Sequence, residues 1–519
     1  MYKKVYIIIS IVLLITSISL TIFNRIYAFP KAGADFIDFT SHFYDVKRYL
    51  KNNVMPTTGA KFQMIDEKIV PRVPGGFFYI HYIICYKLGN GDLEKARFFN
   101  FISMIIPTLI FLFWIYKRFG LGILSILSVL TLFNIYFVYT NNIFYNPNIT
   151  LSLSFLFIVL LGEYQHYNFS CVCGGGGGIT KNIAAMMFFP CLALMGQAHF
   201  AVYYGIVPTI IVYLIIRYKE TIKNIKYLSI GIFISFLTYL PYLVSEIKCN
   251  FYNTKKMLSF SSGSELRNVF PFPQVHSLFM FPTNEFSVMY SANNFDKIMD
   301  FYLNKSPHYI FTLSILIISI VIILIAFIFI LIHFIKNKNN NINESEYILK
   351  ELFLIFLLYF PTTIITTIIG RGIAGQFRYH YGAFALSFIP IIYFLYVLTK
   401  QQKYKILSYI SIFYILSAIA MTFNIMVFYK NYQEPYKWKD YIETVRNIEK
   451  DANNNKFIIT NGNNYFTELG KVYNLTNWIE IKSNANIIYH LENNNNTKNI
   501  NLPIISSNSI YIVYKEIKN

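Results

Sequence analysis

Eleven long apolar runs constrain the fold of this chain of 519 residues more than any other feature. The runs lie at Val5–Phe23, Phe98–Tyr116, Leu121–Tyr139, Ile149–Leu161, Ile183–Gln197, Ala201–Ile216, Tyr227–Val244, Ile310–Ile335, Leu352–Ile369, Tyr381–Leu398 and Ile406–Phe428. A helix needs about 20 apolar residues to cross a bilayer, and several runs are near the lower limit of that length. Together they predict an all-α polytopic membrane protein with about 11 transmembrane helices.

The composition agrees with a membrane protein. Hydrophobic residues make up 55% of the chain and charged residues only 14%, whereas soluble domains contain about a quarter charged residues. The aromatic content of 18% excludes a disordered chain. A net charge of +19 would suit nucleic-acid binding in a soluble protein, but here Lys and Arg flank the apolar runs. We therefore expect contacts with membrane lipids and no nucleic-acid partner.

The basic residues indicate how the predicted spans are oriented. Clusters at Lys3–Lys4, Lys117–Arg118, Arg217–Lys226, Lys336–Lys338 and Lys400–Lys405 all fall on one side of the spans. Short loops on the other side are poor in charge, apart from Arg371 and Arg378. The positive-inside rule then makes the N-terminus cytoplasmic. An odd number of spans makes the C-terminus external, in a multi-pass protein of the cell (inner or plasma) membrane whose first span is an uncleaved anchor.

Two domains are expected from this topology. Residues 1–429 form the membrane domain, with external loops at residues 24–97 and 245–309, and residues 430–519 form an external C-terminal domain. The tail combines a helix-like stretch, Trp438–Glu449, with strand-like runs at Phe457–Thr460 and Ile510–Tyr514. These patterns predict a small α/β domain.

No metal site is expected. Cys171 and Cys173 stand beside five glycines, and His81 and Cys85 are spaced i, i+4, but a zinc site usually needs four ligands. We interpret the first group as a flexible loop and the second as helix packing. The sequence has no Asp-x-Asp string for a metal-bound nucleotide donor.

The first external loop contains acidic residues directly after the first span. Asp35 and Asp38 come first, and residues 38–51 have the pattern of an amphipathic helix lying on the membrane. Its apolar face comprises Phe39, Phe43, Val46 and Leu50. A carboxylate here can accept the proton of a hydroxyl or amine that attacks a sugar carbon. His42 is one turn from Asp38 and could hydrogen-bond it. The alternative is that both aspartates are solvated loop residues.

Polar residues near other predicted span ends are further candidates. His199 and His380 lie at predicted external interfaces, where a polar residue is costly unless it is used. Either could instead be a hydrogen-bonded helix-end histidine. Asn146 begins an apolar run and precedes Pro147, a pattern typical of helix capping, although a substrate-facing amide remains open.

The order of these motifs resembles that of the membrane-embedded GT-C glycosyltransferases. The similarity is greatest to the glycosyltransferase family 39-like group of protein O-mannosyltransferases and aminoarabinose transferases, and it covers about residues 1–430. The matching motifs are DFTSHFYDVKRYLKNN, which begins with Asp38, the segment Pro71–Tyr79, Arg97, Lys117–Gly120, Tyr145–Asn148, Gly196–His199 and Arg378–Tyr381. Each motif is common by itself, and the ordered set carries the resemblance.

The resemblance implies an inverting transfer of a sugar from a polyprenyl-phosphate donor to a lipid, glycan or protein acceptor outside the membrane, without a cofactor. The family's catalytic acid matches Asp38 best, with Asp35 as the second choice. One departure from the family is Phe39, which stands where many members have Glu.

Arginines are expected to stabilise the phosphate that leaves the donor. Arg371 and Arg378 are the first candidates and Arg72 is the third, because Arg suits bidentate phosphate contact. Each could instead be an interfacial or exposed basic residue. The substrate-binding candidates implied by the motif set are His42, Tyr79, Asn146, His199 and His380.

Two other functions are compatible with the topology. A lipid-linked glycan flippase or transporter would predict ionisable residues and broken helices in the middle of the spans, and most spans here lack such charges at their centres. An O-antigen-type ligase would depend on large Arg-rich loops rather than on an acid after the first span.

Overall fold

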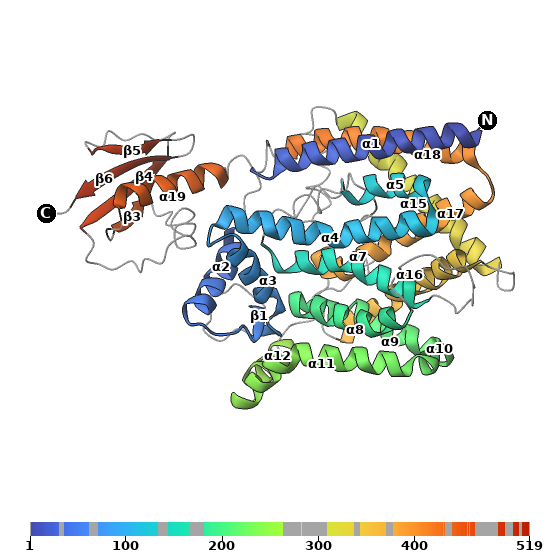
Figure 1. Cartoon of the computed structure of the whole chain (residues 1–519), viewed down its shortest axis with the longest axis horizontal. Helices are drawn as coiled ribbons and strands as arrows, with labels where there is room; N and C mark the ends of the chain where they lie inside the picture. Colours follow the sequence, from blue (N-terminus) through green and yellow to red (C-terminus); the bar gives the residue numbers. More distant parts are fainter. Residues whose placement is uncertain are drawn as a thin grey trace.

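The computed structural model describes residues 2–30, 36–61, 71–132, 144–165, 181–262, 282, 309–336, 343–369, 377–428, 430, 438–453, 455, 457–461, 486–493, 502–507 and 511–517. Figure 1 shows a bundle of helices that run side by side, with the N-terminus at one end of the bundle and the C-terminus beyond the other.

Among the described residues, seven helices are long and apolar enough to cross a membrane. They are α1 (Tyr2–Ala28), α4 (Leu93–Phe119), α7 (Asn146–Tyr164), α11 (Ile225–Lys248), α15 (Tyr309–Lys336), α16 (Glu344–Ile369) and α18 (Tyr404–Phe428). The other four predicted spans coincide with shorter helical segments: α5 (Leu121–Leu132), α8 (Lys181–Ala198), η1 (Phe200–Tyr203) with α9 (Ile206–Ile216), and η4 (Phe377–Ala383) and η5 (Ala385–Phe388) with α17 (Ile389–Lys400). The chain is thus a polytopic α-helical membrane protein.

The membrane environment explains which side chains face outward. Apolar side chains lie on the outside of the bundle, and small polar side chains lie between its helices. On α1, Ile8 and Ile15 are exposed, whereas Ser10 and Ser17 are buried, on a helix that packs along α18 and α5. Lipid removes the hydrophobic driving force between helices, so close packing of small residues takes its place.

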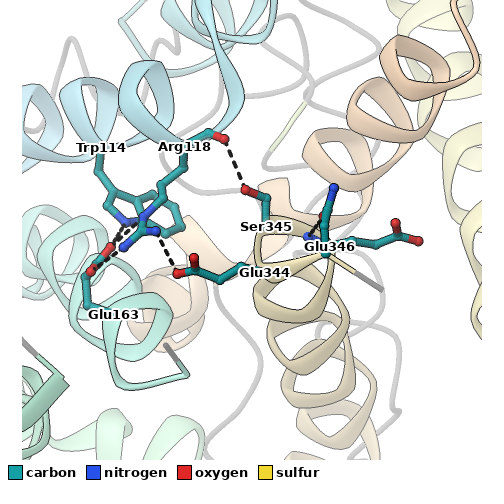
Figure 2. A network of polar contacts seen from close by, with 7 residues as sticks. Trp114, Arg118, Glu163, Glu344, Ser345 and Glu346 are labelled. Carbon is teal, nitrogen blue, oxygen red and sulfur yellow. Dashed lines mark hydrogen bonds and ion pairs between the residues drawn. The ribbon is translucent and has the colours of Figure 1, made fainter. Parts of the chain in front are cut away.

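An ionic network joins three helices at the end of the bundle that carries the N-terminus, which we call the N-terminal end (Figure 2). Glu163 of α7 accepts hydrogen bonds from Trp114 Nε1 at 2.6 Å and from Arg118 Nη2 at 2.7 Å. Arg118 Nη1 also pairs with Glu344 of α16 at 2.9 Å. The two carboxylates compensate the single guanidinium and fix α4, α7 and α16 to one another.

Residues of several basic clusters that were predicted to share one side lie at this end. Arg118 contacts Glu344 at the start of α16, and the ring of Tyr6 lies 5.9 Å from that of Tyr404 at the start of α18. Arg217, after α9, pairs with Glu351 of α16 at 2.6 Å. Residues in three of the clusters therefore lie at one end of the bundle, and the orientation of this end relative to the membrane stays a prediction.

The opposite end, which we call the α2 end, carries most of the first predicted loop (Figure 1). It contains α2 (Phe36–Lys51), the antiparallel strands β1 (Thr58–Lys61) and β2 (Arg72–Pro74), and α3 (Phe77–Leu88). Also present in the chain are α10 (Tyr218–Lys223) and α12 (Tyr252–Ser262), on either side of α11.

The helix α2 begins two residues before the predicted start, and one expectation about it is wrong. Phe43 and Val46 are fully buried within the protein and do not lie on the membrane. The Phe43 ring packs edge-on against Phe144 at 4.7 Å and Tyr86 at 5.9 Å. The apolar stripe is real, but aromatic side chains of other segments cover it in place of lipid.

The tail forms a small α/β unit, as predicted. The helix α19 (Trp438–Ala452) accompanies a four-stranded sheet of order β3-β4-β6-β5, in which β3 and β4 are parallel and the other neighbours are antiparallel. The strands are β3 (Phe457–Asn461), β4 (Ile487–Asn493), β5 (Ile504–Ser507) and β6 (Tyr511–Ile517). Strands β4 and β5 were not predicted. The domain boundary near residue 430 stays a prediction.

Candidate active site

A buried carboxylate, Asp45, is the centre of a polar cluster at the α2 end. Its side chain is 5% exposed. Asp45 Oδ2 accepts a hydrogen bond from Arg72 Nη1 at 2.8 Å and another from the Tyr79 hydroxyl at 2.8 Å. Asp45 Oδ1 pairs with Arg48 Nη2 at 3.2 Å. Three donors from α2, β2 and α3 therefore converge on one carboxylate.

These neighbours decide the protonation state of Asp45. Burial by itself would raise the pKa of the carboxyl, but the Arg72 charge and hydrogen bond, the Tyr79 hydrogen bond and the Arg48 charge lower it overall. Asp45 is consequently an anion at neutral pH. A carboxylate held in this way has little affinity for a further proton.

The sequence of α2 explains why these residues meet. His42, Asp45 and Arg48 are spaced i, i+3, i+6, so each residue lies about one turn from the next along the helix. Phe43 and Val46 lie beside them and are buried in an apolar cluster. Burying the apolar stripe thus draws the neighbouring polar residues toward α3 and β2.

The loop before α3 positions Tyr79 through Gly75 and Gln197. Gly75 has φ +91°, and a Cβ there would overlap the Gln197 side chain. Gln197 Oε1 accepts a hydrogen bond from Phe77 N at 3.2 Å, and its Nε2 donates to Thr238 Oγ1 at 2.8 Å. The first turn of α3 is therefore tied to α8 and α11.

Arg72 connects the cluster to the start of the second predicted loop. Its backbone N donates to Asn253 Oδ1 at 2.8 Å, and Asn253 Nδ2 donates to the Arg72 carbonyl at 2.9 Å. Besides Asp45, Arg72 Nη1 reaches the Gly59 carbonyl at 3.3 Å. The residue thus joins α2, β1, β2 and α12.

His42 is the neutral member of the cluster. The residue is 1% exposed, its Nδ1 lies 3.5 Å from the Tyr79 hydroxyl, and its ring packs edge-on against Phe78 at 4.7 Å. Burial lowers the pKa of His42 to about 3 although the Asp45 charge raises it. Among the described residues, Nε2 has no hydrogen-bond partner, and the Asn146 side chain is a polar neighbour of the ring.

Asn146 does not act as a helix cap. It is the first residue of α7, and Tyr145 occupies the N-cap position. Asn146 Nδ2 donates to the Ala198 carbonyl at 3.0 Å, and one turn later Thr150 Oγ1 donates to the Met195 carbonyl at 3.1 Å. These side chains join α7 to the end of α8 instead.

The two remaining histidine candidates lie farther along the chain. His199 follows α8 directly, and its ring stacks on Tyr379 with ring centroids 5.6 Å apart. His380 is buried, and its Nδ1 lies 2.8 Å from the Tyr359 hydroxyl. Asn146 and His199 are thus brought together through the end of α8, whereas His380 pairs with α16.

The side chains of several predicted site residues lie outside the part of the chain that the structure describes. Asp35 and Arg371 lie outside the described residues, as does the loop with Cys171 and Cys173. Asp38 belongs to the first turn of α2 and Arg378 to η4, but their side chains are also outside it. Whether these residues meet the cluster stays a prediction.

Sequence reasoning did not single out Asp45 or Gln197 as site residues. The signal for Asp45 was present, because a charged residue next to the buried stripe of an amphipathic helix requires a partner. Gln197 belongs to the Gln-x-His motif, of which only His199 was selected. Their partners are distant in sequence, so the pairs could not be read from local spacing.

These features define the chain as a polytopic α-helical membrane protein with a buried, ion-paired cluster at one end of its bundle. No family model matches the sequence, and no curated protein matches it.

Two solved structures are similar to this chain over nearly its whole length. Both are crystal structures of ArnT from Cupriavidus metallidurans, one in the apo state and one bound to undecaprenyl phosphate. The TM-scores are 0.45 and 0.47, with 8% sequence identity, and each comparison covers 96% of this chain and 97% of the other. At this identity the similarity assigns no role to any residue.

Proposed function

We propose that this chain is an inverting membrane glycosyltransferase, which moves a sugar from a polyprenyl-phosphate donor to an acceptor on the external face of the cell membrane. The observation that carries the proposal is a convergence: His42, Arg72, Tyr79 and Asn146 come from three separate motifs and gather around α2. The first turn of that helix contains Asp38. The ordered motif set of the sequence supplies the reaction class.

In the proposed reaction Asp38 is the general base. An acceptor hydroxyl or amine attacks the anomeric carbon of the sugar, and Asp38 takes the proton that the acceptor loses. The bond between the anomeric carbon and the phosphate oxygen breaks, and the polyprenyl phosphate leaves with the electron pair. Asp35 is the alternative base.

Asp45 is not proposed as the base, although it is the best-defined acid of the cluster. Its carboxylate accepts three donors, and its pKa lies below the ordinary value. Both properties oppose the uptake of a proton from an acceptor.

The leaving phosphate is proposed to meet Arg371 and Arg378. Arg72 was the third candidate, but its Nη1 is already committed to Asp45 and Gly59. Cationic groups aimed at the oxygen where charge develops lower the barrier more than they strengthen substrate binding.

The experiment is the Asp38→Asn variant, purified and assayed for transfer from polyprenyl-phosphate monosaccharides in vesicles. Loss of a general base lowers the rate on the order of 100- to 10,000-fold, and we expect a fall of that size. Asp35→Asn is measured in parallel. Glu163→Gln, at the N-terminal end of the bundle, is the control that leaves transfer intact.

The outcomes separate the competing functions. Full activity in Asp38→Asn removes this residue from the mechanism. A wild-type protein that moves a labelled lipid-linked glycan across the bilayer without transfer is a flippase or transporter. Transfer from a diphosphate-linked oligosaccharide alone indicates an O-antigen-type ligase.

A further inference from the structure

Two triads of carboxylate, arginine and tyrosine stand at opposite ends of the bundle. At the α2 end, Asp45 binds Arg72 and the Tyr79 hydroxyl, both at 2.8 Å. At the N-terminal end, Glu351 binds Arg217 Nη2 at 2.6 Å and the Tyr213 hydroxyl at 2.8 Å. The carboxylate side chains are 5% and 2% exposed. The two triads therefore have the same chemistry and nearly the same burial.

The triads differ in the elements that they join. Glu351 links α16 to α9, two helices that also pack extensively along each other. Asp45 links α2 to β2 and α3, and β2 is bound in turn to α12 through both backbone hydrogen bonds of Arg72 to Asn253. The α2 triad thus holds a short helix that is not one of the seven long spans.

Asp45 lies on the same helix as Asp38, the proposed general base. Position 38 precedes position 45 by seven residues, or two turns, so both lie on one side of the helix. Phe43 and Val46 bury the apolar stripe of α2, and His42 adds a polar contact of 3.5 Å with the Tyr79 hydroxyl. The shorter contacts of the charged Asp45 with Arg72 and Tyr79 add the strongest directional constraint on the rotation of α2 about its axis.

We propose that Asp45 is a positioning residue of this transferase: its buried contacts with Arg72 and Tyr79 fix the rotational setting of α2, the helix whose first turn carries Asp38. The inference rests on the proposed function. The two positions are about 10 Å apart along the helix axis, and the adjacent Arg72 and Arg48 compensate the Asp45 charge. Its effect on the reaction is therefore geometric.

The test compares Asp45→Asn with Glu351→Gln, which removes the same chemistry at the other end of the bundle. We measure kcat, the donor KM, the pH profile of kcat, and hydrogen exchange of residues 36–51. A misplacement of about 1 Å can cost on the order of 100-fold in rate, so we expect Asp45→Asn to lose about that factor in kcat. Its donor KM and pH profile stay close to wild type, and exchange in α2 rises. Glu351→Gln changes neither kcat nor α2 exchange.

Each contrary outcome has a distinct meaning. If Asp38→Asn is inactive while Asp45→Asn keeps the wild-type kcat, the inference fails and the proposed function stands. An equal fall of kcat in Asp45→Asn and Glu351→Gln reduces Asp45 to a stability role and also overturns the inference. A wild-type protein without transfer activity overturns the proposed function itself.

A second variant covers the case in which Asp45→Asn does not fold. Arg72→Lys keeps a cation beside Asp45 but loses the planar guanidinium. We expect a smaller fall of kcat with the same rise of exchange in α2. An unchanged kcat together with increased exchange in α2 would contradict the positioning role.

Discussion

At the scale of single residues, the cluster shows how burial acts in opposite directions on an acid and a base. Asp45 is kept charged because two arginines and a tyrosine outweigh its desolvation. His42, one turn away, is kept neutral because burial outweighs the attraction of the Asp45 carboxylate. The cluster therefore presents arginine cations and one anion around an uncharged imidazole.

The neutral His42 predicts a pH dependence of stability. Its pKa falls from 6.5 in the unfolded chain to about 3 in the folded one, so between these values the unfolded state binds the extra proton. The contribution of the neutral His42 to the free energy of unfolding is therefore complete above pH 6.5. This contribution falls as the pH drops toward 3, by up to about 1.4 kcal/mol per pH unit. Thermal unfolding in detergent from pH 7 to pH 4 measures it.

The matched variant is His42→Asn, which keeps a polar side chain without a titrating group. Its unfolding midpoint should fall less between pH 7 and pH 4 than that of the wild type. Identical pH dependence in the two proteins would mean that His42 does not stay neutral on folding. Asp45 affects stability in a separate pH range. Its pKa in the folded protein is lower than the ordinary value of 3.8, so protonation of this residue in the unfolded chain lowers the free energy of unfolding only below about pH 3.8.

At the scale of elements, α3 depends on a backbone turn that a side chain would disturb. Gly75 has φ +91° and faces Gln197, which in turn binds the first turn of α3. Gly120 has nearly the same φ, +92°, with nothing within 4 Å of a Cβ. The two glycines therefore separate the cost of the backbone conformation from the cost of the overlap.

Gly75→Ala should destabilise the protein more than Gly120→Ala. Both variants place a Cβ on a backbone with positive φ, at a cost of about 1–3 kcal/mol, and only Gly75→Ala must also displace the Gln197 side chain. Thermal unfolding compares their stability, and the transferase assay should show a loss for Gly75→Ala alone. Equal melting temperatures for both variants would argue against the close approach.

At the scale of the whole molecule, the tail meets the membrane part at the α2 end. Arg446 of α19 pairs with Asp92, the N-cap of α4, at 3.2 Å, although an exposed ion pair of this kind contributes little. Lys47 of α2 is 4% exposed, and its Nζ has no hydrogen-bond partner among the described residues. Burial lowers the pKa of Lys47 to about 8, against the charge of Glu449 on α19.

Lys47→Met should therefore stabilise the protein. The substitution keeps the aliphatic stem and removes a buried amine that has no hydrogen-bond partner among the described residues, and a buried donor without a partner costs about 1–3 kcal/mol. Thermal unfolding at pH 7 tests this, with Lys51→Met, at an exposed position of the same helix, as the neutral control. A lower midpoint for Lys47→Met would mean that an anion pairs with the amine.

Some elements of the structure could be predicted from the sequence and others could not. The eleven apolar runs, α2 and α19 were predictable because hydropathy and periodicity act over a few turns. Strands β4 and β5 were not predicted, although Ile487, Ile488 and Tyr489 at the start of β4 are residue types that strands favour, because their apolar runs are short and flanked by polar residues. The run at Tyr381–Leu398 appeared as one span but starts with the short turns of η4 and η5.

The amino-acid sequence by itself determined the apolar spans, their order and the helices α2 and α19, because each of these depends on local hydropathy and periodicity. Only the tertiary structure decided which carboxylate would be buried and paired. Asp45 meets Arg72 and Tyr79 because β2 and α3 fold back onto α2. Such long-range contacts leave no periodic trace in the sequence, since the energy of an ion pair depends on distance and burial in space.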